Sequence, residues 1–205
     1  MSRARTPSPP KAEPIAGRLG RSVFVLFTIA LALLWSPCVA LAQLPAPVGS
    51  DVRVVADTIG GVVLGDNATT MLKLINKARA AHGLVQVRPL DVLCSAARAH
   101  SRDMLSADYF SHYSRSGESL ASRLVRYGYS REGYSSWCVG EVIGWGKGIY
   151  GTPEAVFRAW MASSSHRTVI LDRRWRDIGL GVALGTYRGL TNVYMYTVDF
   201  GRRIR

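Results

Sequence analysis

An uncharged stretch near the amino terminus divides this chain into two parts. Residues 23–35 contain no charge and follow a basic segment that holds four prolines. A helix that crosses a bilayer needs about 20 apolar residues, so this shorter run indicates an export signal. The small residues Ala40 and Ala42 predict cleavage after Ala42. Retention as a membrane anchor by residues 23–42 is the alternative, and in both cases the basic flank places the rest of the chain outside the membrane.

The rest of the chain is long enough for one domain with a sizeable core and too short for two. Residues 43–66 contain two prolines and four glycines, which predicts a linker with a short strand at Val52–Ala56 or Val62–Leu64. We therefore expect a signal peptide at residues 1–42, a linker at residues 43–66 and one domain at residues 67–205.

The charge of the chain favours anionic partners. The whole chain has 26 basic and 14 acidic residues, and the part after Ala42 keeps 21 basic and 13 acidic ones, a net charge of +8. Such a surface favours envelope lipids or polymers as partners. The arginines are mostly dispersed, so we expect no nucleic-acid binding. Those that cluster are Arg173, Arg174, Arg176, Arg202, Arg203 and Arg205. We expect a secreted, extracellular monomer that touches the membrane only through its signal segment.

Two cysteines remain after the export segment, which itself contains Cys38. In an exported chain an even number of cysteines indicates a disulfide, here between Cys94 and Cys138. Closing a loop of about 45 residues would stabilise the fold by roughly 4 kcal/mol through the lost entropy of the unfolded chain. Two buried free thiols are the alternative.

Apolar spacing and turn residues predict four helices that are followed by strands. The helices are expected to begin near Asn67, Asp91, Ser119 and Pro153. Three apolar or β-branched runs are typical of strands and cover residues 139–145, 177–184 and 192–200. The loop at residues 185–190 predicts a hairpin between the last two. This order of elements indicates an α+β fold in which helices cover an antiparallel sheet.

A set of short motifs stands in a fixed order between about residue 69 and residue 200. The motifs are Asn76–Arg79 with Gly83-Leu84, Ala97–Met104, Phe110-Ser111-His112, Gly140-Glu141, Trp160–Ser163, His166-Arg167 with Ile170-Leu171, and Ile178–Val182. The ordered set resembles a bacterial-type domain of the CAP superfamily (SCP/TAPS), which includes the cysteine-rich secretory, antigen 5 and pathogenesis-related class one proteins. The resemblance implies an α-β-α sandwich with a central cleft.

The resemblance also implies which residues form that cleft, namely His112, Glu141 and His166. Animal and plant members have a second glutamate three residues after the tryptophan of the fourth helix, and here that position is Ser163. Two imidazoles and a carboxylate suit a divalent metal such as zinc. Without the second glutamate, Glu141 would have to serve as both ligand and general base. Histidines that only hold loops together through hydrogen bonds to Glu141 are the alternative.

These observations leave three functions open. The favoured one is a secreted CAP-domain protein of the cell envelope or extracellular space that binds lipid, glycan or protein partners through the His112, Glu141 and His166 cleft. The second is a metal-assisted hydrolase that uses the same cleft, and the third is a structural envelope module without a small ligand. The sequence does not decide whether the protein is an enzyme.

Overall fold

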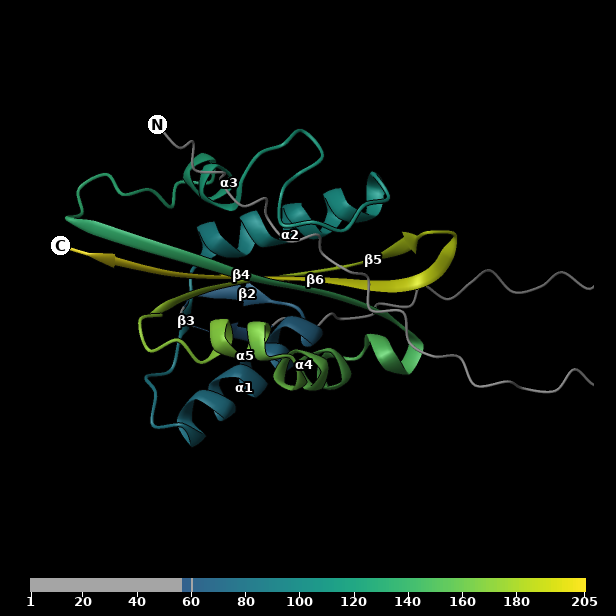
Figure 1. The fold of residues 1–205 in the computed structure, drawn as a ribbon, viewed down its shortest axis with the longest axis horizontal. Helices are drawn as coiled ribbons and strands as arrows, with labels where there is room; N and C mark the ends of the chain where they lie inside the picture. The colour runs from purple at the N-terminus through teal and green to yellow at the C-terminus, as the bar shows by residue number, and fades with distance from the viewer. Residues whose placement is uncertain (1–56, 60) are drawn as a thin grey trace, which may run out of the picture. The chain divides into compact units, whose positions relative to one another are not determined.

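The computed structural model describes residues 57–59 and 61–205 (Figure 1). The predicted signal peptide, its cleavage after Ala42 and most of the predicted linker lie outside the described residues. Within the described ranges, no helix is both long enough and apolar enough to cross a membrane. The export segment therefore stays a prediction from the sequence.

A four-stranded sheet forms the centre of the domain. Its strands are β3 (Arg88–Pro89), β4 (Ser136–Lys147), β5 (Asp177–Tyr187) and β6 (Leu190–Ile204), in the order β3-β5-β6-β4. The three long strands pair antiparallel, as predicted, and β5 and β6 form the predicted hairpin. Its turn residues Arg188 and Gly189 both have positive φ, as in a type I′ turn. The two-residue β3 pairs parallel with β5, so the sheet is mixed and not purely antiparallel.

Helices cover both faces of this sheet, which makes the fold an α-β-α sandwich (Figure 1). α2 (Asp91–Ser106) and α3 (Leu120–Arg126) lie on one face. α1 (Asp66–Ala81), α4 (Pro153–Ala162) and α5 (Ser164–Ile170) lie on the other face. A 3-10 turn, η1 (Gly148–Gly151), joins β4 to α4, and a small hairpin of β1 (Asp57–Ile59) and β2 (Val62–Leu64) precedes α1. The predicted fold class is confirmed.

Local sequence explains where the helices begin. Ser119 and Thr152 cap α3 and α4, and the side chain of each accepts a hydrogen bond from a backbone N–H three residues further on. Pro153 occupies the first turn of α4, where its missing N–H costs no hydrogen bond. α1 begins at Asp66, one residue before the predicted Asn67.

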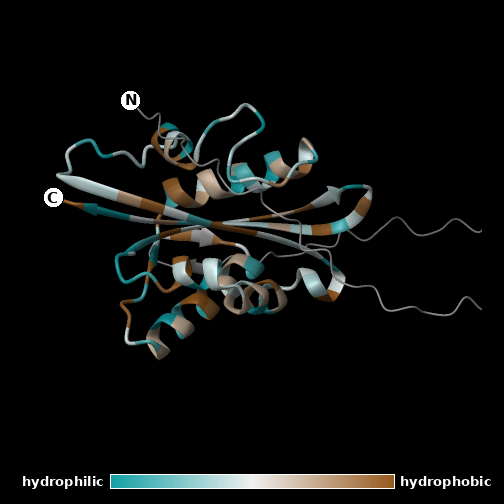
Figure 2. Cartoon of the chain, viewed as in Figure 1, coloured by the Kyte–Doolittle hydropathy of each residue, from teal (hydrophilic) through white to brown (hydrophobic). Residues whose placement is uncertain are grey.

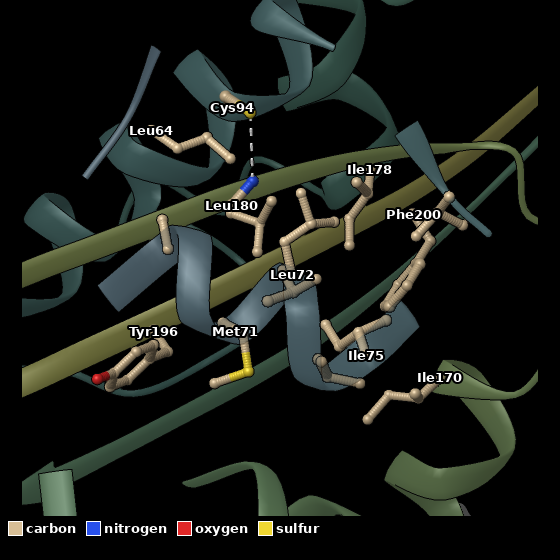
Figure 3. Close-up of a cluster of buried hydrophobic side chains, with 14 of the residues drawn as sticks. Leu64, Met71, Leu72, Ile75, Cys94, Ile170, Ile178, Leu180, Tyr196 and Phe200 are labelled. Carbon is tan, nitrogen blue, oxygen red and sulfur yellow. Dashed lines mark hydrogen bonds between the residues drawn. The ribbon is translucent and has the colours of Figure 1, made fainter. Parts of the chain in front are cut away.

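The largest core cluster lies between α1 and the sheet, where hydrophobic segments meet (Figure 2). Met71, Leu72 and Ile75 of α1 are buried. They lie close to Leu180 of β5 and Phe200 of β6 in this cluster (Figure 3). The spacing of the three α1 residues follows the helical repeat, so one stripe of α1 supplies this part of the core.

The second helical layer sits unusually close to the sheet. α2 packs on β5 at Gly179 and Gly181, and a Cβ on Gly181 would lie 2.1 Å from the backbone carbonyl carbon of Ala97. A Cβ on Gly179 would lie 2.3 Å from the same atom of Leu93. β5 therefore needs glycines on the face that α2 covers and apolar side chains on the other face, which explains its alternating small and apolar residues.

The predicted disulfide between Cys94 and Cys138 is wrong, because both cysteines are free. Cys94 lies on α2 with its Sγ 3.5 Å from the backbone nitrogen of Leu180 in β5, whereas Cys138 lies in β4, beyond β6. Leu180 pairs with Val198, which pairs with Val142, so Cys138 stands four residues further along β4. Two strand spacings and four residues amount to roughly 16 Å, well beyond the Cα separation of about 7 Å that a disulfide tolerates.

Candidate functional site

Glu141 lies in β4, an edge strand of the sheet, and its side chain points toward α2 and α3. The preceding Gly140 faces the other layer, because a Cβ there would lie 2.8 Å from the ring of Trp175 and 3.5 Å from Val169 of α5. Side chains alternate along a strand, so Glu141 faces the opposite layer. Its side chain is only 1% exposed, so its charge needs partners within the protein.

Two partners hold the Glu141 carboxylate. Oε2 forms an ion pair with the guanidinium of Arg123 in α3. Oε1 accepts a hydrogen bond of 2.7 Å from Nδ1 of His112, which lies in the loop between α2 and α3. An ionised carboxylate can only accept, so Nδ1 of His112 carries a hydrogen and Nε2 of the neutral ring keeps a lone pair. The His112 side chain is 53% exposed, and a ligand can therefore reach it.

His166 approaches this edge from the opposite helical layer. It lies in α5, with Nδ1 2.8 Å from Oγ of Ser163, the single residue between α4 and α5. The pKa of His166 is lowered, first because the ring is partly buried and then because His112 is near enough to disfavour a second positive charge. The two imidazoles thus come from opposite layers and lie near each other. Within residues 61–205 no hydrogen bond joins His166 to Glu141.

Three buried residues around Glu141 belong to the site but were not expected there from the motifs: His100, Arg123 and Asp199. The pKa of His100 is lowered, mainly by burial and then by the charge of Arg123, and both causes favour the neutral ring. Its Nε2 donates a hydrogen bond of 2.9 Å to the carbonyl of Ser111 and lies 4.0 Å from Glu141 Oε2. A charged residue inside an apolar strand, as at Asp199, is the one sequence signal that could have revealed this cluster.

These contacts show whether the predicted trio fits a metal ion. Among residues 57–59 and 61–205, no three His, Cys, Asp or Glu side chains converge as metal ligands would. Glu141 has one oxygen on Arg123 and the other on His112, and Nδ1 of His166 faces Ser163. A divalent ion such as zinc needs three or four converging ligands, so the residues in this arrangement do not fit it.

Two hollows in the described part of the chain lie near these elements. One, of about 280 Å³, has a polar wall between α2 and α3 that includes His100 and Arg123. The other, of about 730 Å³, lies between the start of α1 and the β5–β6 sheet, and its wall includes Leu180, Leu184 and Tyr194. Only the polar hollow contains residues that contact Glu141.

A mixed sheet between two helical layers, with Glu141 on its edge strand and His112 in a loop against it, defines an α-β-α sandwich protein. The CAP family model, described as the cysteine-rich secretory protein family, matches residues 72–200. The match spans more than half of the chain, and the chain belongs to this family. The resemblance inferred from the ordered motifs is therefore confirmed.

Curated relatives share part of this chain. It is 34% identical over 111 residues to the uncharacterized protein YkwD of Bacillus subtilis, covering 54% of this chain and 40% of that protein. It is 32% identical over 113 residues to the uncharacterized membrane protein YlbC of the same organism, covering 55% of this chain and 30% of the relative. The chain thus spans less than half the length of either relative.

Solved structures show the same fold. An extracellular protein of Bacillus anthracis that contains an SCP domain is similar with a TM-score of 0.55 and 27% identity, over 66% of this chain and 40% of that one. An outer surface protein of Borrelia burgdorferi has a TM-score of 0.56 and 19% identity, over 67% of this chain and 93% of that one. The second likeness concerns the fold alone.

Proposed function

We propose that this chain is an exported CAP-domain protein of the cell envelope or extracellular space that binds a glycan through the cleft of His112, Glu141 and His166. The observation that carries the proposal is the chain of contacts from Arg123 through Glu141 to His112. These contacts hold an exposed imidazole in one orientation, with Nε2 unpaired. Export is supported by the uncharged amino-terminal segment and by the description of the Bacillus anthracis neighbour as extracellular.

The surroundings of His112 favour a glycan over a lipid. Phe110 and Tyr113 flank His112 in the chain and are 39% and 60% exposed. Exposed aromatic rings beside a few hydrogen-bonding groups suit ligands with both apolar faces and hydroxyls, and Nε2 of His112 accepts a hydrogen bond from a hydroxyl. A lipid tail needs an apolar pocket, and the larger hollow in the described residues lies at Leu180 and Leu184, away from the histidines.

The two alternative functions have less support. For a hydrolase, Nε2 of His112 is a candidate general base, but the ligand arrangement offers no metal-bound water. The hydroxyl of Ser163 contacts Nδ1 of His166, and no carboxylate in residues 61–205 hydrogen-bonds His166 to orient it as a base. A purely structural module does not require an exposed imidazole with an open nitrogen.

The test compares the exported protein with a variant that lacks both cleft histidines, His112→Ala with His166→Ala. Soluble envelope glycan fragments are titrated into each protein in a calorimeter. His82→Ala is the matched control, since His82 is exposed at the end of α1, with Nδ1 2.8 Å from the carbonyl of Ala78. We expect the double variant to bind at least tenfold more weakly, and the control to bind like the wild type. Absence of binding by all three proteins favours the structural module, and stoichiometric zinc that the double variant loses favours the hydrolase.

A further inference from the structure

One end of the sheet collects arginines from β3 and β6 and from the segments that precede β5 and follow β6. β3, β4 and β5 begin at this end and β6 finishes there, as the pairing of Arg88 with Asp177, of Asp177 with Gly201, and of Cys138 with Arg202 shows. In Figure 1 the carboxyl terminus marks this end, and Figure 2 shows the last part of β6 as hydrophilic. We call it the arginine end, defined by the exposed or half-buried Arg88, Arg173, Arg202, Arg203 and Arg205.

The arginine end concentrates the excess charge of the domain. Besides its five defining arginines it contains Arg131, Arg174 and Arg176, against only three acids, Glu132, Asp172 and Asp177. Its net charge is therefore +5. The described residues carry 20 basic and 12 acidic side chains, a net charge of +8. More than half of the net positive charge of the described residues therefore lies at one end, although the arginines are dispersed along the sequence.

Two of the three acids of this end are already engaged. Asp172 pairs with Arg174, and Asp177 accepts a hydrogen bond of 2.7 Å from the Tyr129 hydroxyl. Among the residues that the structure describes, no hydrogen bond or ion pair occupies the five guanidinium groups that define the arginine end. They are therefore available to an external anion.

Two aromatic rings orient the guanidinium of Arg203. Its guanidinium lies 4.4 Å from the ring centre of Tyr129 and 4.6 Å from that of Tyr134. Stacking on aromatic faces orients the planar group and leaves its N–H donors at the edges. A guanidinium with free edges matches the paired oxygens of a phosphate better than any other side chain does. The arginine end therefore presents donors of the kind that phosphate groups accept.

The arrangement favours a flexible polymer over a flat membrane. Arg202 and Arg203 are neighbours in a strand and point to opposite faces of the sheet, so a membrane lying on either face would touch only one of them. Of the exposed large apolar residues in the strands, Ile204 of β6 lies at the arginine end. Trp145, with Ile149 and Tyr150 of η1, lies toward the opposite end of β4. Most exposed large apolar side chains of the strands therefore lie away from the charge, whereas membrane binding needs both on one surface.

We propose that the arginine end binds a linear phosphodiester polymer of the cell envelope. This surface is distinct from the histidine cleft, and the proposal goes beyond the binding function assigned to that cleft. Several arginines around one end of the sheet would contact successive phosphates of one chain. Binding is then electrostatic and weakens with salt in proportion to the number of phosphates contacted.

The probe for this proposal is lipid-free poly(glycerol phosphate), titrated into the exported protein at several salt concentrations. The test variant is Arg88→Gln with Arg173→Gln and Arg202→Gln, three side chains without hydrogen-bond partners among the described residues. We expect roughly tenfold weaker binding at 0.1 M salt, and a slope of log K against log salt that is smaller by about two. A control with the same charge change replaces Lys77, Arg102 and Arg158, which are exposed on α1, α2 and α4, with glutamine.

Each further outcome has a defined meaning. The proposal is overturned if the control variant loses as much affinity as the test variant, because net charge alone then explains binding. It is overturned as well if phosphatidylglycerol vesicles bind and the free polymer does not, or if single-stranded DNA with the same number of phosphates binds more tightly. The variant without His112 and His166 should bind the polymer like the wild type. A negative result for glycan binding at the histidines therefore does not affect the test of polymer binding at the arginine end.

Discussion

Glu141 and Asp199 lie directly opposite each other in the antiparallel pair of β4 and β6. Directly paired side chains share one face, with their Cβ atoms about 5 Å apart, and both of these are buried. Arg123 neutralises only Glu141 by direct contact. The pKa of Asp199 is therefore raised well above its ordinary value, first by burial and then by the charge of Glu141. The arrangement favours the protonated form of Asp199, because a neutral carboxyl avoids a second buried negative charge beside Glu141.

This relationship predicts how stability depends on pH. Because the pKa of Asp199 is raised in the folded state, the unfolded chain loses this proton from about pH 4, whereas the folded protein keeps it. The free energy of unfolding contributed by this residue therefore falls as pH rises from 4 toward the raised pKa. Asp199→Asn removes the effect, so the variant should gain stability relative to the wild type between pH 4 and pH 7. Urea unfolding at pH 4 and at pH 7 measures the free energy of unfolding of both proteins. The same difference between variant and wild type at the two pH values would contradict this prediction.

The ion pair between Arg123 and Glu141 should matter more than any exposed pair. Removing one partner leaves a buried charge without compensation, so Arg123→Met should lower the free energy of unfolding by about 3–5 kcal/mol. Adding Glu141→Gln to that variant should recover part of the loss. Arg126→Met is the matched control, because Arg126 is 57% exposed and pairs with Glu118, and it should cost about 1 kcal/mol or less. Equal losses for the two methionine variants would argue against a buried ion pair.

The titration of His166 should depend on His112. Since burial and the charge of His112 lower the pKa of His166, its NMR signals should titrate below the ordinary histidine value of about 6.5. His112→Ala removes one of the two causes and should shift the His166 titration upward. An unchanged His166 titration in that variant would show that the two rings are too far apart to form one cleft.

The cysteines should behave as two unequal free thiols. Burial raises the pKa of the Cys94 thiol, which slows its reaction, because the thiolate is the nucleophile. In the native protein, Cys138 should therefore be alkylated first and Cys94 only after unfolding. Mass spectrometry without reductant measures the order of alkylation. A mass two hydrogens below that of the reduced protein, with no alkylation, would show that the two cysteines form a disulfide.

Much of the fold can be predicted from the sequence because its elements carry local signals. The apolar spacing in α1, the cap at Ser119, the proline that opens α4 and the β-branched run of β6 each act over a few residues. The disulfide could not be judged in the same way. Whether Cys94 and Cys138 meet depends on strand order, which inserts β6 between them, and no local pattern encodes that order.

The candidate site, like the fold, can be predicted from the sequence only in part. His112, Glu141 and His166 stand in recognisable motifs, so the sequence identifies them. Their actual partners are long-range contacts: Arg123 reaches Glu141 from another element, and Asp199 faces Glu141 only because of the β4–β6 register. These contacts change the chemistry expected of the site, since they occupy the carboxylate that a metal would need.

The most direct test of this account is the tautomer of His112, which long-range ¹⁵N–¹H correlation spectra report for each ring. The contact with Glu141 predicts a neutral ring protonated at Nδ1, with Nε2 bare, at a pH where the ring is uncharged. In Glu141→Gln the preference for this tautomer should weaken, because the charged acceptor is gone. A wild-type His112 protonated at Nε2, or one that averages both tautomers, would contradict the claim that the Arg123–Glu141–His112 chain prepares this imidazole for a ligand.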